Sequence, residues 1–116
     1  MTVYYARPIN LYNTPQDERD IALLKSMGLD IINPNKEELS KRYAVEGMNV
    51  FIEAMKDCDA LAFRSFPDGK ISAGVYKEIT QAQQDGKIVF ELPTLTSSRI
   101  LSVDDTREYL KLLGAR

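Results

Sequence analysis

Short apolar runs alternate with helical patterns along the whole chain. Four runs rich in β-branched, aromatic or small apolar residues predict strands, at 2–6, 29–33, 59–64 and 87–92. The run at 59–64 is almost continuously apolar, which is typical of a strand buried on both faces. Helical patterns lie between and after these strands, at 14–27, 35–43, 48–56, 72–85 and 102–114.

The first and the fourth of these helices have clear start signals, stop signals and apolar stripes. Thr14 is a suitable N-cap with Pro15 at the first helical position, and Gly28 is a natural stop. The predicted inward-facing residues of the two helices are Ile21, Leu24, Met27, Val75, Ile79 and Ala82. Both helices should therefore lie flat against a sheet.

The middle of the chain has a weaker pattern. Residues 35–43 have a helical composition but poor periodicity, and Gly47 separates them from a second helix at 48–56. That second helix has a broad apolar face for so small a protein, made of Val50, Phe51, Ala54 and Met55. Beyond the fourth strand, 93–99 is a loop rich in Thr and Ser, with a short strand possible near Ile100.

This alternation of strands and helices predicts the fold class. We expect one α/β domain over residues 1–116, a three-layer sandwich with a mostly parallel sheet of four or five strands, of the flavodoxin or Rossmann type. Ligands of such sheets bind outside the carboxyl ends of the strands. The search for a site is thereby narrowed to the loops that follow the four strands.

Composition removes several classes of function. The chain has no histidine and one cysteine, Cys58, which excludes Ser-His-Asp and Cys-His nucleophiles and any intramolecular disulfide. We expect no metal and no cofactor. The net charge of −2 weakens the case for nucleic-acid binding. No run approaches a membrane span and no targeting segment is evident, so we expect a cytoplasmic protein.

The loop after the third strand is the most informative one. Ser72 and Gly74 fall at the start of a helix, where unpaired backbone N–H groups favour an anion such as phosphate. Glu78 lies at the edge of the buried stripe of that helix, from which a carboxylate can face the strand ends. The alternative interpretation is an ordinary Ser N-cap with a half-exposed glutamate.

Three pieces of sequence resemble the nucleoside 2-deoxyribosyltransferase superfamily. They are Tyr4-Tyr5-Ala6-Arg7-Pro8, Cys58-Asp59-Ala60-Leu61-Ala62-Phe63 and Ser72-Ala73-Gly74-Val75-Tyr76-Lys77-Glu78. Within that superfamily the chain is more similar to the 2′-deoxynucleoside 5′-monophosphate N-glycosidases and pyrimidine nucleotide hydrolases. The transferases have Asp where this chain has Ser72, and a carboxylate there would repel a 5′-phosphate.

The resemblance implies a mechanism and the residues that perform it. Glu78 would be the nucleophile that attacks C1′ of the sugar, and Tyr4 would hold it in place by a hydrogen bond. The function expected is hydrolysis of the N-glycosidic bond of a nucleoside 5′-monophosphate by a homodimer or a dimer of dimers. The apolar face at 48–56 is the region that packs against a partner subunit in the superfamily.

Two positions depart from the superfamily pattern. Arg7 replaces a glycine, and it is either a phosphate ligand or an obstruction in the pocket. The superfamily's acid that protonates the leaving base falls near Phe51, which is not acidic, although Asn49 nearby can hydrogen-bond a base. Arg64 and Ser97 are further candidates for contact with phosphate or base.

Other functions stay open on the sequence alone. A base-exchange transferase of the same superfamily is disfavoured by Ser72. A nucleotide-binding module without turnover is favoured by Arg7 and by the missing acid. A flavodoxin-like protein that binds some other phosphorylated ligand is the fourth possibility.

Overall fold

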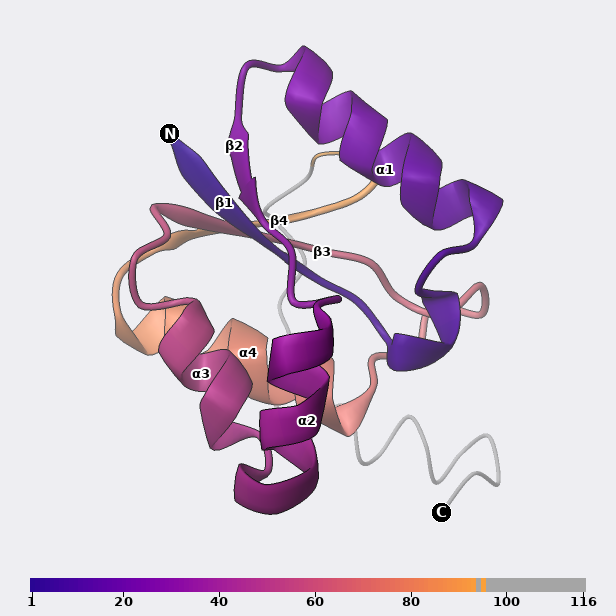
Figure 1. Ribbon diagram of the computed structural model, residues 1–116. Coiled ribbons are helices and arrows are strands. Elements are labelled where there is room, and N and C mark those ends of the chain that lie inside the picture. The colour runs from indigo at the N-terminus through magenta and orange to yellow at the C-terminus, as the bar shows by residue number, and fades with distance from the viewer. Residues whose placement is uncertain (94, 96–116) are drawn as a thin grey trace.

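The sheet has four parallel strands. In the computed structural model, which describes residues 1–93 and 95, strand order is β2-β1-β3-β4 (Figure 1). The strands are β1 (Thr2–Ala6), β2 (Asp30–Ile32), β3 (Ala60–Phe63) and β4 (Ile88–Glu91). All three pairings are parallel, with Tyr4 opposite Ile32 on one side and Leu61 on the other. The four predicted strands and the parallel sheet are confirmed.

Helices cover both faces of this sheet. The helical elements are η1 (Ile9–Leu11), α1 (Pro15–Ser26), α2 (Glu37–Glu46), α3 (Asn49–Ala54) and α4 (Ala73–Gln84). Helix α1 lies on one side of the sheet, and α2, α3 and α4 lie on the other (Figure 1). The predicted three-layer α/β sandwich is therefore confirmed.

The two faces of the sheet bury separate apolar clusters. Successive side chains of β1 alternate between them, because side chains of a strand point to opposite faces. Tyr4 packs with Leu61, Val75 and Ile79 on the α4 side. The α1 side holds Val3, Tyr5, Leu24, Ala60, Ala62 and Leu92. Every residue of β3 is buried, as its continuous apolar run predicted.

Helix α1 begins and ends close to the predicted residues. The Thr14 side chain accepts a hydrogen bond from the backbone N–H of Asp17 at 3.2 Å, and Gly28 adopts a positive φ of 78°. Leu24 is buried as predicted, but the inward position of Met27 is wrong, since 46% of that residue is exposed. Met27 is the C-cap of the helix, where the backbone leaves helical geometry and the stripe no longer continues.

The apolar residues of the middle segment serve the chain's own core. Helix α3 is shorter than the predicted helix at 48–56, and its Val50 and Phe51, with Met55 just beyond it, are buried within the chain. The predicted homodimer therefore receives no support from these side chains and stays a prediction.

The predicted helix at 102–114 and the strand near Ile100 lie outside the described residues. In the part of the chain that the structure describes, no helix combines the length and apolar character needed to cross a bilayer.

Candidate active site

A cavity of about 220 Å³ lies at the carboxyl end of β1, beside the start of α4. Its wall is formed by the segment after β1, by α2 and α3, and by the β3–α4 loop and α4 itself. The lining residues are Arg7, Pro8, Ile9, Asn10, Tyr12, Tyr43, Met48, Phe51, Phe66, Ser72, Gly74, Val75 and Glu78. This is the edge of the sheet where the parallel topology predicted a ligand.

Glu78 is the one carboxylate among the described residues of the cavity wall. It lies on the buried side of α4 and is 5% exposed, so the half-exposed alternative does not hold. Burial raises the pKa of Glu78 from its ordinary 4.5 to about 7, while the Tyr4 hydroxyl and the Arg7 guanidinium act in the opposite direction. The carboxyl group therefore exchanges its proton near neutral pH.

The Tyr4 hydroxyl is paired with Glu78 electrostatically but has no formed hydrogen bond. Tyr4 is fully buried, and its oxygen has no hydrogen-bond partner of ordinary geometry among the described residues. Its pKa lies well above the usual value, first because of burial and then because of the negative charge and hydrogen-bonding proximity of Glu78. Hydrogen bonds of catalytic groups are often long or misaligned without substrate and tighten when it binds. A donor beside a carboxylate is the arrangement that the resemblance assigned to these two residues.

The start of α4 brings Ser72 and Gly74 to the same cavity. The Ser72 side chain caps the helix by accepting a hydrogen bond from the Val75 N–H at 3.3 Å. Gly74 lines the cavity beside Met48, and a Cβ added at this position would lie 3.4 Å from the Met48 sulfur, an ordinary contact distance. A helix N-terminus carries a partial positive charge, which suits an anionic part of a ligand.

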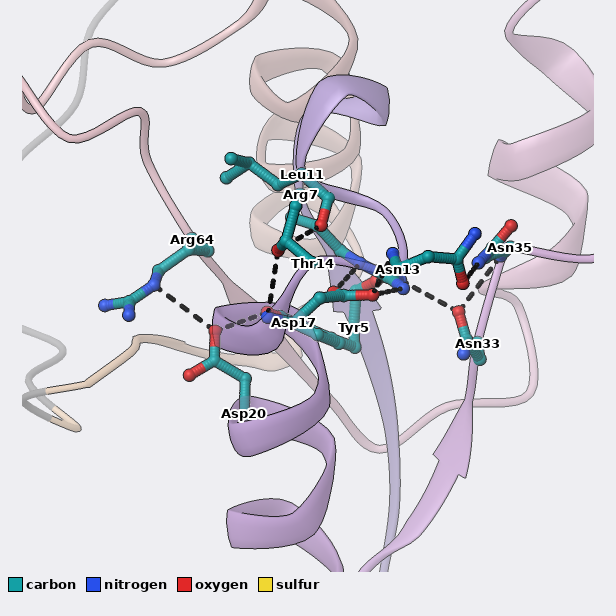
Figure 2. Close-up of polar contacts among 10 residues, drawn as sticks. All are labelled: Tyr5, Arg7, Leu11, Asn13, Thr14, Asp17, Asp20, Asn33, Asn35 and Arg64. Carbon is teal, nitrogen blue, oxygen red and sulfur yellow. Dashed lines mark hydrogen bonds and ion pairs between the residues drawn. The ribbon is translucent and has the colours of Figure 1, made fainter.

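Arg7 lines the cavity, but most of its donors bind protein groups. Its side chain is fully buried and makes a two-point ion pair with Asp17, at 2.6 Å from Nε and 3.0 Å from Nη2 (Figure 2). Nη1 donates to the Tyr5 carbonyl at 3.2 Å and to Asn33 Oδ1 at 2.8 Å. Contact of Arg7 with phosphate stays a prediction, and four of the five N–H groups of a guanidinium are already used here.

Arg64 belongs to a different cavity. Its guanidinium pairs with Asp20 at 3.2 Å, and the same carboxylate accepts a 2.5 Å hydrogen bond from the Tyr5 hydroxyl. Figure 2 shows that Asp17 and Asp20, both on α1, pair with different arginines: Asp17 with Arg7 and Asp20 with Arg64. The Arg64 cavity, of about 390 Å³, lies at the ends of β3 and β4 and does not include Glu78.

The structure thus brings together part of the predicted set. Glu78, Ser72, Gly74 and Arg7 share one cavity, and Tyr4 lies behind Glu78. Asn49 is exposed and is not part of the wall, since Met48 and Phe51 on either side of it point inward instead. Ser97 lies outside the described residues.

Several residues of the cavity wall were not predicted from the sequence. Tyr12 follows η1 and stacks on Arg7, and Tyr43 at the end of α2 packs against Phe51 with ring centroids 5.2 Å apart. Phe66 comes from the turn after β3. No local pattern marks these aromatic residues, because they meet only through the tertiary structure. Burial of Tyr12 raises its pKa to about 12, although Arg7 acts against this.

The fold is shared with two solved structures of nucleoside-processing proteins. The chain is similar in structure to a 2-desoxiribosyltransferase from Leishmania mexicana, with a TM-score of 0.54 and 17% identity over 94% of this chain and 95% of that one. It is similar to the CMP N-glycosidase BcmB of Clostridium botulinum, with a TM-score of 0.54 and 20% identity over 100% of both chains. No protein-family model and no curated protein matches the sequence. A fold shared by a transferase and an N-glycosidase is consistent with the motifs in β1, β3 and α4.

The raised pKa of Glu78 predicts a dependence of stability on pH. Between pH 4.5 and about 7 the unfolded chain releases a proton that folded Glu78 retains, so stability falls as pH rises. Glu78→Gln should remove this loss and raise the free energy of unfolding at pH 8 by about 2–3 kcal/mol. Urea unfolding of both proteins at about pH 4.5 and pH 8 measures it, and the same difference at both pH values would contradict the prediction.

Proposed function

We propose that this protein hydrolyses the N-glycosidic bond of nucleoside 5′-monophosphates. The main support for this proposal is the buried Glu78 carboxyl group in the cavity wall. Glu78 lies on α4, the helix whose N-terminus is capped by Ser72. A carboxylate and a helix N-terminus at one cavity suit a ligand with an electrophilic carbon and an anionic group. The structural likeness to a CMP N-glycosidase supports the same reaction class.

The reaction would proceed in two displacements. A Glu78 oxygen attacks C1′, the bond from C1′ to the base nitrogen breaks, and the electron pair leaves with the base, which takes a proton from water. The product is a glycosyl ester on Glu78. A water molecule then attacks C1′, breaks the ester and releases a sugar 5-phosphate, which restores the carboxylate. The net reaction consumes one water and yields free base and sugar phosphate.

Activity should rise with pH through neutrality. Only the ionised carboxyl group can attack C1′, and the pKa of Glu78 is about 7. The kcat/KM profile of the free enzyme should therefore show an acid limb with a midpoint near pH 7. A profile that stays flat down to pH 5 would argue against Glu78 as the nucleophile.

A panel of nucleoside and deoxynucleoside 5′-monophosphates tests the function. Release of free base, followed by chromatography, is the expected result for at least one of them. Addition of a second free base separates hydrolysis from base exchange, since a transferase would form a new nucleoside. No base release from any member, combined with unmeasurable binding, would refute the proposal.

A nucleotide-binding module without turnover is the second candidate function. The observation that favours it is the apolar wall at Met48 and Phe51: among the described residues of the cavity wall, no carboxyl group besides Glu78 is present to protonate a leaving base. Such a module would bind a monophosphate with micromolar affinity and release no base. The same panel, measured by calorimetry as well as by chromatography, separates the two candidates.

Ser72 should set the preference for a phosphorylated ligand. Ser72→Asp places a carboxylate where the phosphate is proposed to bind, and should weaken monophosphate binding by about 1–3 kcal/mol. Binding of the unphosphorylated nucleoside should change much less, which makes it the matched control. Calorimetry with both ligands checks this, and equal weakening of both would contradict the assignment of Ser72 to the phosphate.

A further inference from the structure

Arg7 is a buried cation at the cavity wall. The sequence suggested only a phosphate ligand or an obstruction at this position, but the side chain makes several contacts with protein groups. Its guanidinium lies 4.4 Å from the ring centroid of Tyr5 and 4.4 Å from that of Tyr12. Both rings thus contact the guanidinium, and the Asp17 carboxylate accepts two hydrogen bonds from it. A planar guanidinium meets all these contacts together, which a lysine ammonium cannot do.

The same contacts hold three segments of the chain together. Arg7 follows β1, Tyr12 follows η1, and Asp17 lies in the first turn of α1. Asp17 Oδ2 also accepts a hydrogen bond from the Asn13 N–H at 3.0 Å, and Arg7 Nη1 reaches Asn33 just after β2 at 2.8 Å. The segment from Pro8 to Asn13 is thereby fixed as the part of the cavity wall that carries Tyr12.

We propose that Arg7 is a positioning residue of this site: with Asp17 it fixes the segment that carries Tyr12, and it places a guanidinium in the same cavity wall as Glu78. The inference rests on the proposed function insofar as an ionised Glu78 is what the reaction needs. In this proposal Arg7, which stands where the superfamily pattern has a glycine, acts through its contacts with other protein groups. Direct binding of phosphate by Arg7 is not required.

The surroundings of Glu78 support a role for this charge. The titratable groups that face it are Tyr4 from β1, Tyr12 from the segment after η1, Tyr43 from α2, and Arg7. Arg7 is the one cation among the described residues of the cavity wall. It lowers the pKa of Glu78 against the effect of burial.

The test uses the double variant Arg7→Gln/Asp17→Asn. It replaces both charges by amides of similar size, so that neither partner is left as an unpaired buried charge. The full chain, labelled with ¹³C at glutamate side-chain carboxyls, is titrated by NMR, and Glu78→Gln identifies the signal of Glu78. We expect the titration midpoint of Glu78 to move upward, but by less than the ~1–3 units that loss of one nearby opposite charge alone would cause, because the negative charge of Asp17 is removed with that of Arg7. In base release, the acid limb of kcat/KM should move by the same amount.

Arg64→Gln/Asp20→Asn is the matched control, because it neutralises a second Arg–Asp pair, between Arg64 after β3 and Asp20 on α1, and Arg64 lines the other cavity. That variant should leave the Glu78 midpoint unchanged. An unchanged midpoint in the Arg7→Gln/Asp17→Asn protein, or equal shifts in both double variants, would overturn the proposal. The NMR readout needs no substrate, so a protein that shifts as expected but releases no base refutes the proposed function alone.

Discussion

Glu78→Gln should reduce base release from a nucleoside monophosphate by on the order of 10³-fold or more, which corresponds to about 4 kcal/mol in the barrier. Glutamine keeps the size of the side chain but lacks the charge that attacks C1′. The affinity for substrate should change little, because the carboxylate acts mainly in the transition state. Single-turnover kinetics and calorimetry on the same protein measure the two quantities separately.

Two further variants control this experiment. Glu78→Ala should be as damaging as Glu78→Gln, since both lack the nucleophile. Glu91→Gln should be milder, because Glu91 lies at the end of β4 and lines the Arg64 cavity instead. A Glu78→Gln protein with near wild-type base release would exclude the glycosyl-enzyme mechanism. Mass spectrometry of the wild-type protein during turnover offers a direct view of the ester.

Asp17→Ala should destabilise the protein by about 3–5 kcal/mol. Both members of the Arg7–Asp17 pair are almost completely buried, and the variant leaves the guanidinium without its counter-charge. It also removes the acceptor of the Asn13 N–H. Urea unfolding at neutral pH measures the loss.

An exposed ion pair provides the comparison. Lys41 and Glu37 pair at 3.2 Å on α2, with side chains 76% and 84% exposed, and such pairs contribute little to stability. Glu37→Ala should therefore leave the unfolding midpoint nearly unchanged. An Asp17→Ala protein as stable as Glu37→Ala would show that the buried pair does not stabilise the segment after β1, and the positioning role of Arg7 would lose its structural basis.

The strands and the ends of α1 and α4 were predictable because their signals are local. A buried strand such as β3 needs only a run of small and apolar residues, and Thr14 and Ser72 cap their helices through contacts three residues away. Glu78 and Ser72 were singled out by their positions in one helix, and the resemblance supplied the roles expected of them. The type of an element and the residues where it begins and ends can therefore be predicted from its own residues.

The polar network around α1 was not predicted, because its partners come from distant segments. Asp17 lies in the first turn of the predicted helix at 14–27, yet it is buried against Arg7, which follows β1. Asp20 binds Tyr5 and Arg64. One signal was available in retrospect. Asp17 and Asp20 continue, toward the N-terminus, the stripe that contains Leu24, and charged residues on a buried stripe require partners.

The strand order has a consequence for how the chain acquires its structure. β1 is the first strand in sequence, yet it lies inside the sheet, between β2 and β3. Just before the pairing of β1 with β3 begins, the Thr2 N–H donates to the Asp59 carboxylate, 57 positions later. During synthesis on the ribosome, the strand that carries Tyr4 must wait until β3 has emerged before both of its edges are covered. Because closing so long a loop is entropically costly, we expect folding to be limited by this central pairing, with the cavity at the carboxyl end of β1 forming only afterwards.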